Sequence, residues 1–114
     1  MTTQTLDKLQ TLARLEEIIA SRAAAADGET SYTAGLLAAG SEKCARKFGE
    51  EAIELILASQ GRDANHTTAE AADVVYHLLV LLKAAGVSLD QVMDELHNRF
   101  SQSGLEEKAS RNPD

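Results

Sequence analysis

Hydrophobic residues recur at three- and four-residue steps along most of the chain, which is the spacing of amphipathic helices. In the first such stretch, residues 5–25, the apolar positions are Leu6, Leu9, Leu12, Leu15, Ile18 and Ile19. A turn signal, Asp-Gly-Glu, follows this stretch. Residues 31–40 then predict a short helix. Ser31 or Thr33 would cap it, and Gly40 would close it in a left-handed conformation.

A second long helix is predicted over 42–60, with Ser41 as its cap and Gly61 at its end. Its charged side chains gather within about 100° of one another around the helix axis. They are Lys47, Glu50, Glu51 and Glu54. The opposite side is apolar and carries Phe48, Ala52, Leu55 and Ile56. This helix therefore has one charged stripe and one packing face.

After a loop at 61–67, residues 66–85 predict a helix that is apolar on almost every face, as buried helices are. The exceptions gather in its N-terminal half. Glu70, Asp73 and His77 lie there within a sector of about 60°.

The last predicted helix spans 89–101 and begins with a capping box formed by Ser88 and Gln91. Alanine and leucine dominate the composition, which favours helix over sheet. We therefore expect an all-α fold, a bundle of four main helices and one short helix. It would form a single domain over 1–104, followed by a polar tail at 105–114.

Composition limits the partners. The 114 residues are 44% hydrophobic and 25% charged, as in one globular domain. A net charge of −7 argues against sequence-independent binding of nucleic acid, but a metal ion can reverse the local charge and admit a phosphorylated small molecule. Cys44 is the sole cysteine, so no intramolecular disulfide is possible. No signal peptide is recognisable, and the most apolar stretch, 74–87, is shorter than the roughly 20 residues of a bilayer span. We expect a cytoplasmic protein without a membrane or nucleic-acid partner.

Two pairs of acids stand three residues apart on the two central helices. Glu51 and Glu54 form the first pair, and Glu70 and Asp73 the second. Residues at this spacing share a helix face. If the two helices pack antiparallel, four carboxylates converge, and they repel one another unless a cation lies between them.

A simpler interpretation exists for most of these acids. Glu51 pairs with Lys47 at the i,i+4 spacing of ordinary surface decoration, and Glu70 completes a capping box with Thr67. Asp73 resists this interpretation, because it lies one turn inside an apolar helix. A buried carboxylate costs several kcal/mol unless it is paired. We therefore favour a metal site.

The donor types indicate which metal. A cluster made of carboxylates suits a hard cation, Mg²⁺ or, as a substitute, Mn²⁺. The histidines His66, His77 and His97 are too scattered for a zinc motif, and Cys44 stands alone. The chain has no glycine-rich phosphate loop, but metal ions can themselves hold phosphate oxygens.

The acidic motif and its flanks resemble a known family. Gly-Glu-Glu-Ala-Ile-Glu at 49–54 and Glu-Ala-Ala-Asp at 70–73 match the E-E-x-x-E … E-x-x-D signature of the all-α, MazG-type nucleotide pyrophosphatases. Four flanking segments resemble more closely the phosphoribosyl-ATP pyrophosphatase family of histidine biosynthesis. They are I-I-A-S-R at 18–22, S-Y-T-A-G-L-L-A-A-G at 31–40, K-F-G-E-E-A-I-E at 47–54 and D-V-V-Y-H-L-L-V-L-L at 73–82. The resemblance covers about residues 5–100 and is that of a stand-alone domain. Phe48 departs from it, being bulkier than the aliphatic residue expected before Gly-Glu-Glu.

The resemblance implies a reaction and roles. Water would cleave the phosphoanhydride between the α and β phosphates of phosphoribosyl-ATP, giving phosphoribosyl-AMP and pyrophosphate. The implied Mg²⁺ ligands are Glu51, Glu54, Glu70 and Asp73. Glu50 would orient or deprotonate the water, or support a ligand. The implied substrate-binding residues are Arg22, Ser31, Tyr32, Thr33, Lys43 and Lys47.

Two other functions stay open at this stage. The acidic motif is shared across the superfamily, so a house-cleaning pyrophosphatase for nucleoside triphosphates would carry it too. A non-catalytic helical interaction module would carry the acids as a solvated patch. We also expect a homodimer, because four main helices are too few to cover the helix at 66–85, and the family resemblance implies the same.

Overall fold

The computed structural model describes residues 2–25 and 31–100, and within these ranges it contains helices and no strand. The elements are α1 (Thr3–Ala25), α2 (Tyr32–Ala39), α3 (Ser41–Gln60), α4 (Ala64–Ala85) and α5 (Leu89–Phe100). The predicted all-α fold of four main helices and one short helix is confirmed. The predicted tail at 105–114 and the predicted domain end at 104 lie outside the described residues.

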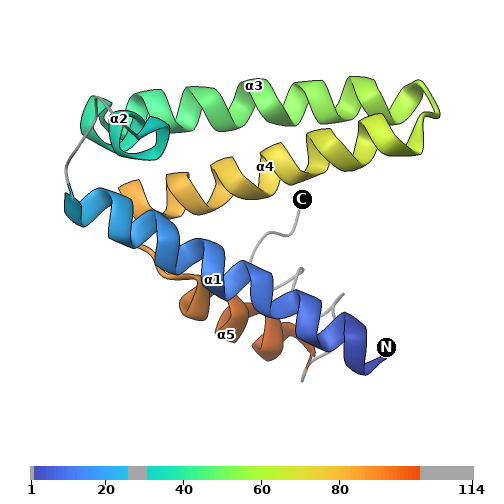
Figure 1. Ribbon diagram of the computed structural model, residues 1–114, viewed down its shortest axis with the longest axis horizontal. Helices are drawn as coiled ribbons and strands as arrows, with labels where there is room; N and C mark the ends of the chain where they lie inside the picture. Colours follow the sequence, from blue (N-terminus) through green and yellow to red (C-terminus); the bar gives the residue numbers. More distant parts are fainter. Residues whose placement is uncertain (1, 26–30, 101–114) are drawn as a thin grey trace, which may run out of the picture.

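The helices α3 and α4 form an antiparallel hairpin (Figure 1). The short helix α2 lies at the N-terminal end of α3, and α1 and α5 lie on the far side of α4 from α3 (Figure 1). Helix α4 contacts α1, α2 and α3. The apolar helix predicted at 66–85 is therefore the centre of the bundle, and the antiparallel packing on which the acid cluster depends is confirmed.

The junction between α2 and α3 differs from the prediction. Ser31 does cap α2, because its hydroxyl accepts a hydrogen bond from the Ala34 backbone N–H at 3.2 Å. Gly40, however, has φ 104° and ψ 169°, a positive-φ conformation that is extended rather than left-handed helical. This one residue turns the chain, and its carbonyl accepts from the Cys44 N–H at 3.2 Å. The predicted cap Ser41 is therefore wrong, since Ser41 already lies inside α3.

The turn between α3 and α4 is shorter than the predicted loop at 61–67. Asp63 caps α4 by accepting hydrogen bonds from the N–H groups of Asn65 and His66, so the helix begins at Ala64. The proposed capping box of Thr67 with Glu70 is thereby wrong. Thr67 instead donates its hydroxyl hydrogen bond to the Ala58 carbonyl at 3.2 Å, which ties the two helices together. Glu70 is consequently free of a capping role.

The capping box at the start of α5 is confirmed. The Ser88 N–H donates to the Gln91 side-chain oxygen at 2.9 Å, and the Gln91 N–H donates to the Ser88 hydroxyl at 3.1 Å. Two orphan donors at the helix start are satisfied reciprocally in this way.

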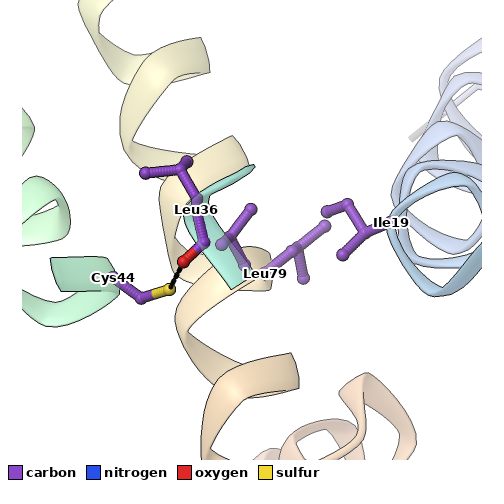
Figure 2. Close-up of a cluster of buried hydrophobic side chains, with 5 residues drawn as sticks. Ile19, Leu36, Cys44 and Leu79 are labelled. Atoms are coloured by element: carbon purple, nitrogen blue, oxygen red, sulfur yellow. Dashed lines mark hydrogen bonds between the residues drawn. The ribbon is translucent and has the colours of Figure 1, made fainter. Parts of the chain in front are cut away.

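The buried core gathers where α1, α2, α3 and α4 meet. It contains Ile19, Leu36, Cys44, Leu79 and Val80. Figure 2 shows Ile19 reaching toward Leu79 from α1, and the Cys44 thiol donating to the Leu36 carbonyl at 3.3 Å. Burial raises the pKa of the Cys44 thiol, so this side chain is a neutral core residue.

No single described helix is long and apolar enough to cross a membrane. Of these helices, only α4 and α5 taken together have the required length and composition, and they are bent by 106° where they join.

Candidate functional site

Three carboxylates meet between α3 and α4. Glu51 on α3 and Glu70 and Asp73 on α4 each place one oxygen within 4.8 Å of the others. The reason is local: Glu70 and Asp73 are three residues apart on one face of α4, and that face packs against the charged stripe of α3. The structure thus confirms that acids from the two predicted pairs converge. Asp73, however, is exposed, so the expectation that it is a buried carboxylate is wrong.

The geometry of these carboxylates fits a cation. The Glu51 and Glu70 side chains are only 14% and 18% exposed, and each has a buried oxygen, Oε2, with no hydrogen-bond partner among the described residues. A buried acceptor without a donor is costly, and no side-chain N–H or O–H of residues 2–25 or 31–100 donates to either Oε2 atom. A hard divalent ion prefers oxygen ligands of this kind. Glu51, Glu70 and Asp73 are therefore the residues that could hold Mg²⁺ or Mn²⁺.

The electrostatics agree with that interpretation. Burial raises the pKa of Glu51, and the carboxylates of Glu54 and Asp73 raise it further, while Lys47 lowers it. The protein without a cation therefore resists full ionisation of this group. Glu54, predicted as a fourth ligand, is exposed and is not one of the three converging carboxylates, but its effect on Glu51 places it beside them.

Glu50 faces a cation of the protein itself. Its carboxylate lies 3.2 Å from the Lys47 ammonium, which is also 4.0 Å from Glu51. The hydrogen bond to Glu50 raises the pKa of Lys47, so the ammonium keeps its charge at neutral pH. Glu50 is half-exposed and lies outside the converging group. The structure thus places one carboxylate, that of Glu50, and one ammonium, that of Lys47, at the margin of the three converging carboxylates.

The Ser-Tyr-Thr segment at 31–33 lies near both α3 and α4, the helices that carry the acids. Ser31 is buried as the cap of α2, and Thr33 shares a hydrogen bond with the Tyr76 hydroxyl of α4. Tyr32 is 60% exposed, and its ring stacks at 6.4 Å from the ring of Tyr76. Tyr32 lies near the Lys47 ammonium. Of the three, Tyr32 therefore has the side chain most open to a ligand.

Two predicted substrate residues are not brought to the carboxylates by any described contact. Arg22 is exposed in the last turn of α1, and Lys43 is exposed near the start of α3. Both are cations on the α2 side of the molecule, since α1 ends and α3 begins beside α2 (Figure 1). They can meet only a ligand that reaches beyond the acid group.

The sequence assigns no task at the site to His66 or Tyr76. It places His77 on the acidic face, where support of a neighbouring carboxylate is one interpretation and a structural buried histidine is the other. His66 Nε2 lies 3.5 Å from Glu70 Oε1, an i,i+4 pair already contained in the helix predicted at 66–85. Tyr76 binds Thr33, a contact across 43 residues with no local signal. His77 is buried, and its sequence position on the acidic face was the only hint of its place.

Hollows on the surface formed by the described residues include one beside the acids and one away from them. One, of about 480 Å³, lies at the α3–α4 turn beside the acids and is lined by Glu54, Leu57, Ala58, Gly61, His66 and Glu70. The other, of about 400 Å³, lies between α1, α4 and the start of α5. The hollow between α1, α4 and α5 is lined by none of the predicted site residues. We therefore place the candidate site beside the hollow at the α3–α4 turn.

Comparison with known proteins identifies the family of this chain. The family model for phosphoribosyl-ATP pyrophosphohydrolase matches residues 12–100. The phosphoribosyl-ATP pyrophosphatase 1 of Bradyrhizobium diazoefficiens is 55% identical over 101 residues, which cover 89% of this chain and 94% of that protein. The phosphoribosyl-ATP pyrophosphatase of Rhizobium meliloti is 54% identical with the same coverage. That of Dinoroseobacter shibae is 54% identical over 103 residues, 90% of this chain and 100% of its own length. The chain belongs to the phosphoribosyl-ATP pyrophosphohydrolase family.

Proposed function

We propose that this chain is a phosphoribosyl-ATP pyrophosphohydrolase of histidine biosynthesis. It would hydrolyse the bond between the α and β phosphates of phosphoribosyl-ATP. The observation that carries the proposal is the convergence of Glu51, Glu70 and Asp73, with two buried oxygens left without donors, in a chain of this family. A cytoplasmic location is part of the proposal, because a substrate with this many charges does not cross a membrane unaided.

The reaction consumes one water. The water oxygen forms a bond to phosphorus as the bridging P–O bond breaks, and pyrophosphate leaves. Bound Mg²⁺ supplies charge stabilisation to the phosphate oxygens. Glu51, Glu70 and Asp73 would hold it, with Glu54 beside them, and Mn²⁺ could replace it.

Protein side chains would perform the remaining tasks. Glu50, at the margin of the acids and 3.2 Å from Lys47, is the proposed group that orients the water or takes its proton. Lys47 is charged and 28% exposed, so its ammonium can turn from Glu50 toward a phosphate oxygen. Lys43, Arg22 and the segment Ser31-Tyr32-Thr33 would hold the second ribose phosphate.

Two alternatives remain candidates for experiment. A house-cleaning pyrophosphatase needs the same acids and differs only in what it recognises beyond the triphosphate. An interaction module without catalysis would present its acids to solvent. The buried oxygens of Glu51 and Glu70 argue against the second alternative, because a solvated patch would leave them exposed.

The proposal predicts Mg²⁺-dependent release of pyrophosphate from phosphoribosyl-ATP by the purified chain. Product would be measured as inorganic phosphate after coupling to an inorganic pyrophosphatase. Chelation of the metal should abolish release, and adding Mg²⁺ in excess should restore it. No release above the chelated control would overturn the proposed function.

We further propose that the protein is a homodimer. Within the described residues, the buried apolar side chains are few, whereas large apolar side chains are exposed on α1, α3 and α5. Ile53, Ile56 and Leu57 on α3 are 59%, 61% and 67% exposed, and Phe100 on α5 is 80% exposed. Ile53, Ile56 and Leu57 stand three and four residues apart, so they share one face of α3. An exposed apolar patch of this kind is typical of a subunit interface. A two-fold related copy would cover the same face on both chains.

A charged residue in this face should weaken the dimer. We expect Ile56→Glu to convert a dimer into monomer at micromolar concentration, because each copy would place one carboxylate in an apolar contact. Gln60→Glu, one turn further along α3, adds the same charge without removing an apolar side chain and serves as the control. Analytical ultracentrifugation measures the result. A wild-type chain that sediments as a folded monomer would contradict the proposal.

A further inference from the structure

His77 is a buried polar residue to which the proposed reaction assigns no task. Its side chain lies on α4 and the residue is 5% exposed. The Nδ1 atom is buried and has no hydrogen-bond partner among the described residues. Buried polar atoms in native proteins are nearly always paired, so an exception needs a physical reason.

The neighbours fix the orientation of this imidazole without satisfying Nδ1. The ring of Tyr76 lies edge-on at 4.9 Å between centroids, and that of Tyr32 lies edge-on at 6.2 Å. The Tyr76 hydroxyl is already bound to Thr33. The packing therefore holds the ring in place and leaves its Nδ1 for a partner from elsewhere.

The acid group is one source of such a partner. His77 is one turn beyond Asp73 on the same face of α4, the i,i+4 relation of residues that share a surface. The charged groups facing it are Asp73 from α4 and Lys47 and Glu50 from α3. Burial lowers the pKa of His77 and Lys47 lowers it further, whereas the two acids raise it. A neutral ring does not repel a cation and can accept or donate a hydrogen bond at Nδ1.

We infer that His77 is a positioning residue whose Nδ1 forms a hydrogen bond with a water bound to the divalent cation held by Glu51, Glu70 and Asp73. The inference rests on the metal site of the proposed function. Mg²⁺ requires six ligands and keeps several waters when few carboxylates bind it. Hydrogen bonds to such outer groups fix the ion, and their loss costs about 10- to 100-fold in metal affinity.

Two variants separate the polar atom from the bulk of the side chain. His77→Leu keeps an apolar volume and removes Nδ1, whereas His77→Asn keeps a polar atom near the position of Nδ1. Mn²⁺ binding to the protein without nucleotide, measured by titration calorimetry, is the readout. We expect His77→Leu to weaken Mn²⁺ binding by about 10- to 100-fold and His77→Asn to stay within about threefold of wild type.

A control and a second measurement keep the outcomes apart. His97→Leu, on exposed α5, should bind Mn²⁺ as the wild type does. The metal-free His77→Leu protein should melt at or above the wild-type temperature, because a buried unpaired atom has been removed. Wild-type affinity in His77→Leu would overturn the inference and leave the metal site standing. Equal loss in His77→Leu and His77→Asn would overturn it too, since packing would then be the cause. Absence of Mn²⁺ binding by the wild type would overturn the metal site and the inference together.

Discussion

Replacing a converging carboxylate by its amide is expected to lower turnover of phosphoribosyl-ATP by about 10²-fold or more, because a lost ligand misplaces the ion that holds the phosphate. The variants of the three converging acids are Glu51→Gln, Glu70→Gln and Asp73→Asn, and Glu54→Gln replaces the acid beside them. The smallest loss is expected for Glu54→Gln, since Glu54 is not one of the three carboxylates within 4.8 Å of one another. Initial rates of pyrophosphate release at saturating Mg²⁺ measure the effect.

The same variants should leave the fold intact. Because the pKa of Glu51 is raised above its ordinary value of 4.5, the metal-free folded chain binds that proton more tightly than the unfolded chain. Its stability therefore falls as pH rises from about the ordinary value through the raised one. Glu51→Gln lacks this decline, so at pH 7 the metal-free variant should melt at or above the wild-type temperature.

The control for both measurements is Glu95→Gln, an exposed acid on α5 that pairs with Arg99 at 3.3 Å. It removes the same charge far from the acid group and should change neither turnover nor melting by much. Near-normal turnover in two of the three variants at Glu51, Glu70 and Asp73 would contradict the metal assignment.

The parts of this fold that were predicted depend on local pattern. The spacing of apolar residues placed the five helices, and the paired acids on two such helices placed Glu51, Glu70 and Asp73 together. Antiparallel neighbours joined by a short turn are a general consequence of chain connectivity. The convergence of these three acids needed no further information.

The misses arose where two equally good local signals competed. Ser41 is a strong cap candidate, but Gly40 turns the chain in one residue and leaves Ser41 inside the helix. Thr67 is a second strong cap candidate. Asp63 lies earlier in the chain, however, and its carboxylate accepts two backbone hydrogen bonds at the start of α4. Contacts such as Thr33 with Tyr76 join residues far apart in sequence, so no pattern along the chain could indicate them.

Selectivity for phosphoribosyl-ATP over ATP and dCTP is expected to reach at least about 10²-fold in kcat/KM. All three substrates offer the same triphosphate to the carboxylates, so discrimination must come from groups beyond the α and β phosphates. Phosphoribosyl-ATP carries a second ribose phosphate, whose oxygens can form charge-assisted hydrogen bonds. Tyr32 is exposed beside Lys47, and Arg22 and Lys43 add positive charge on the α2 side of the site. ATP leaves such groups without their partner, and that mismatch is costly.

Removing one of these cations should affect the larger substrate alone. We expect Arg22→Ala to raise KM for phosphoribosyl-ATP by about tenfold, the loss typical of one hydrogen bond to a charged group, and to leave any slow ATP hydrolysis unchanged. Arg14→Ala, an exposed arginine two turns earlier on α1, is the matched control and should change neither. The assay compares pyrophosphate release from equal concentrations of phosphoribosyl-ATP, ATP and dCTP. Equal efficiency on the three substrates would favour a house-cleaning pyrophosphatase, because a site that ignores the second ribose phosphate has no means of preferring it.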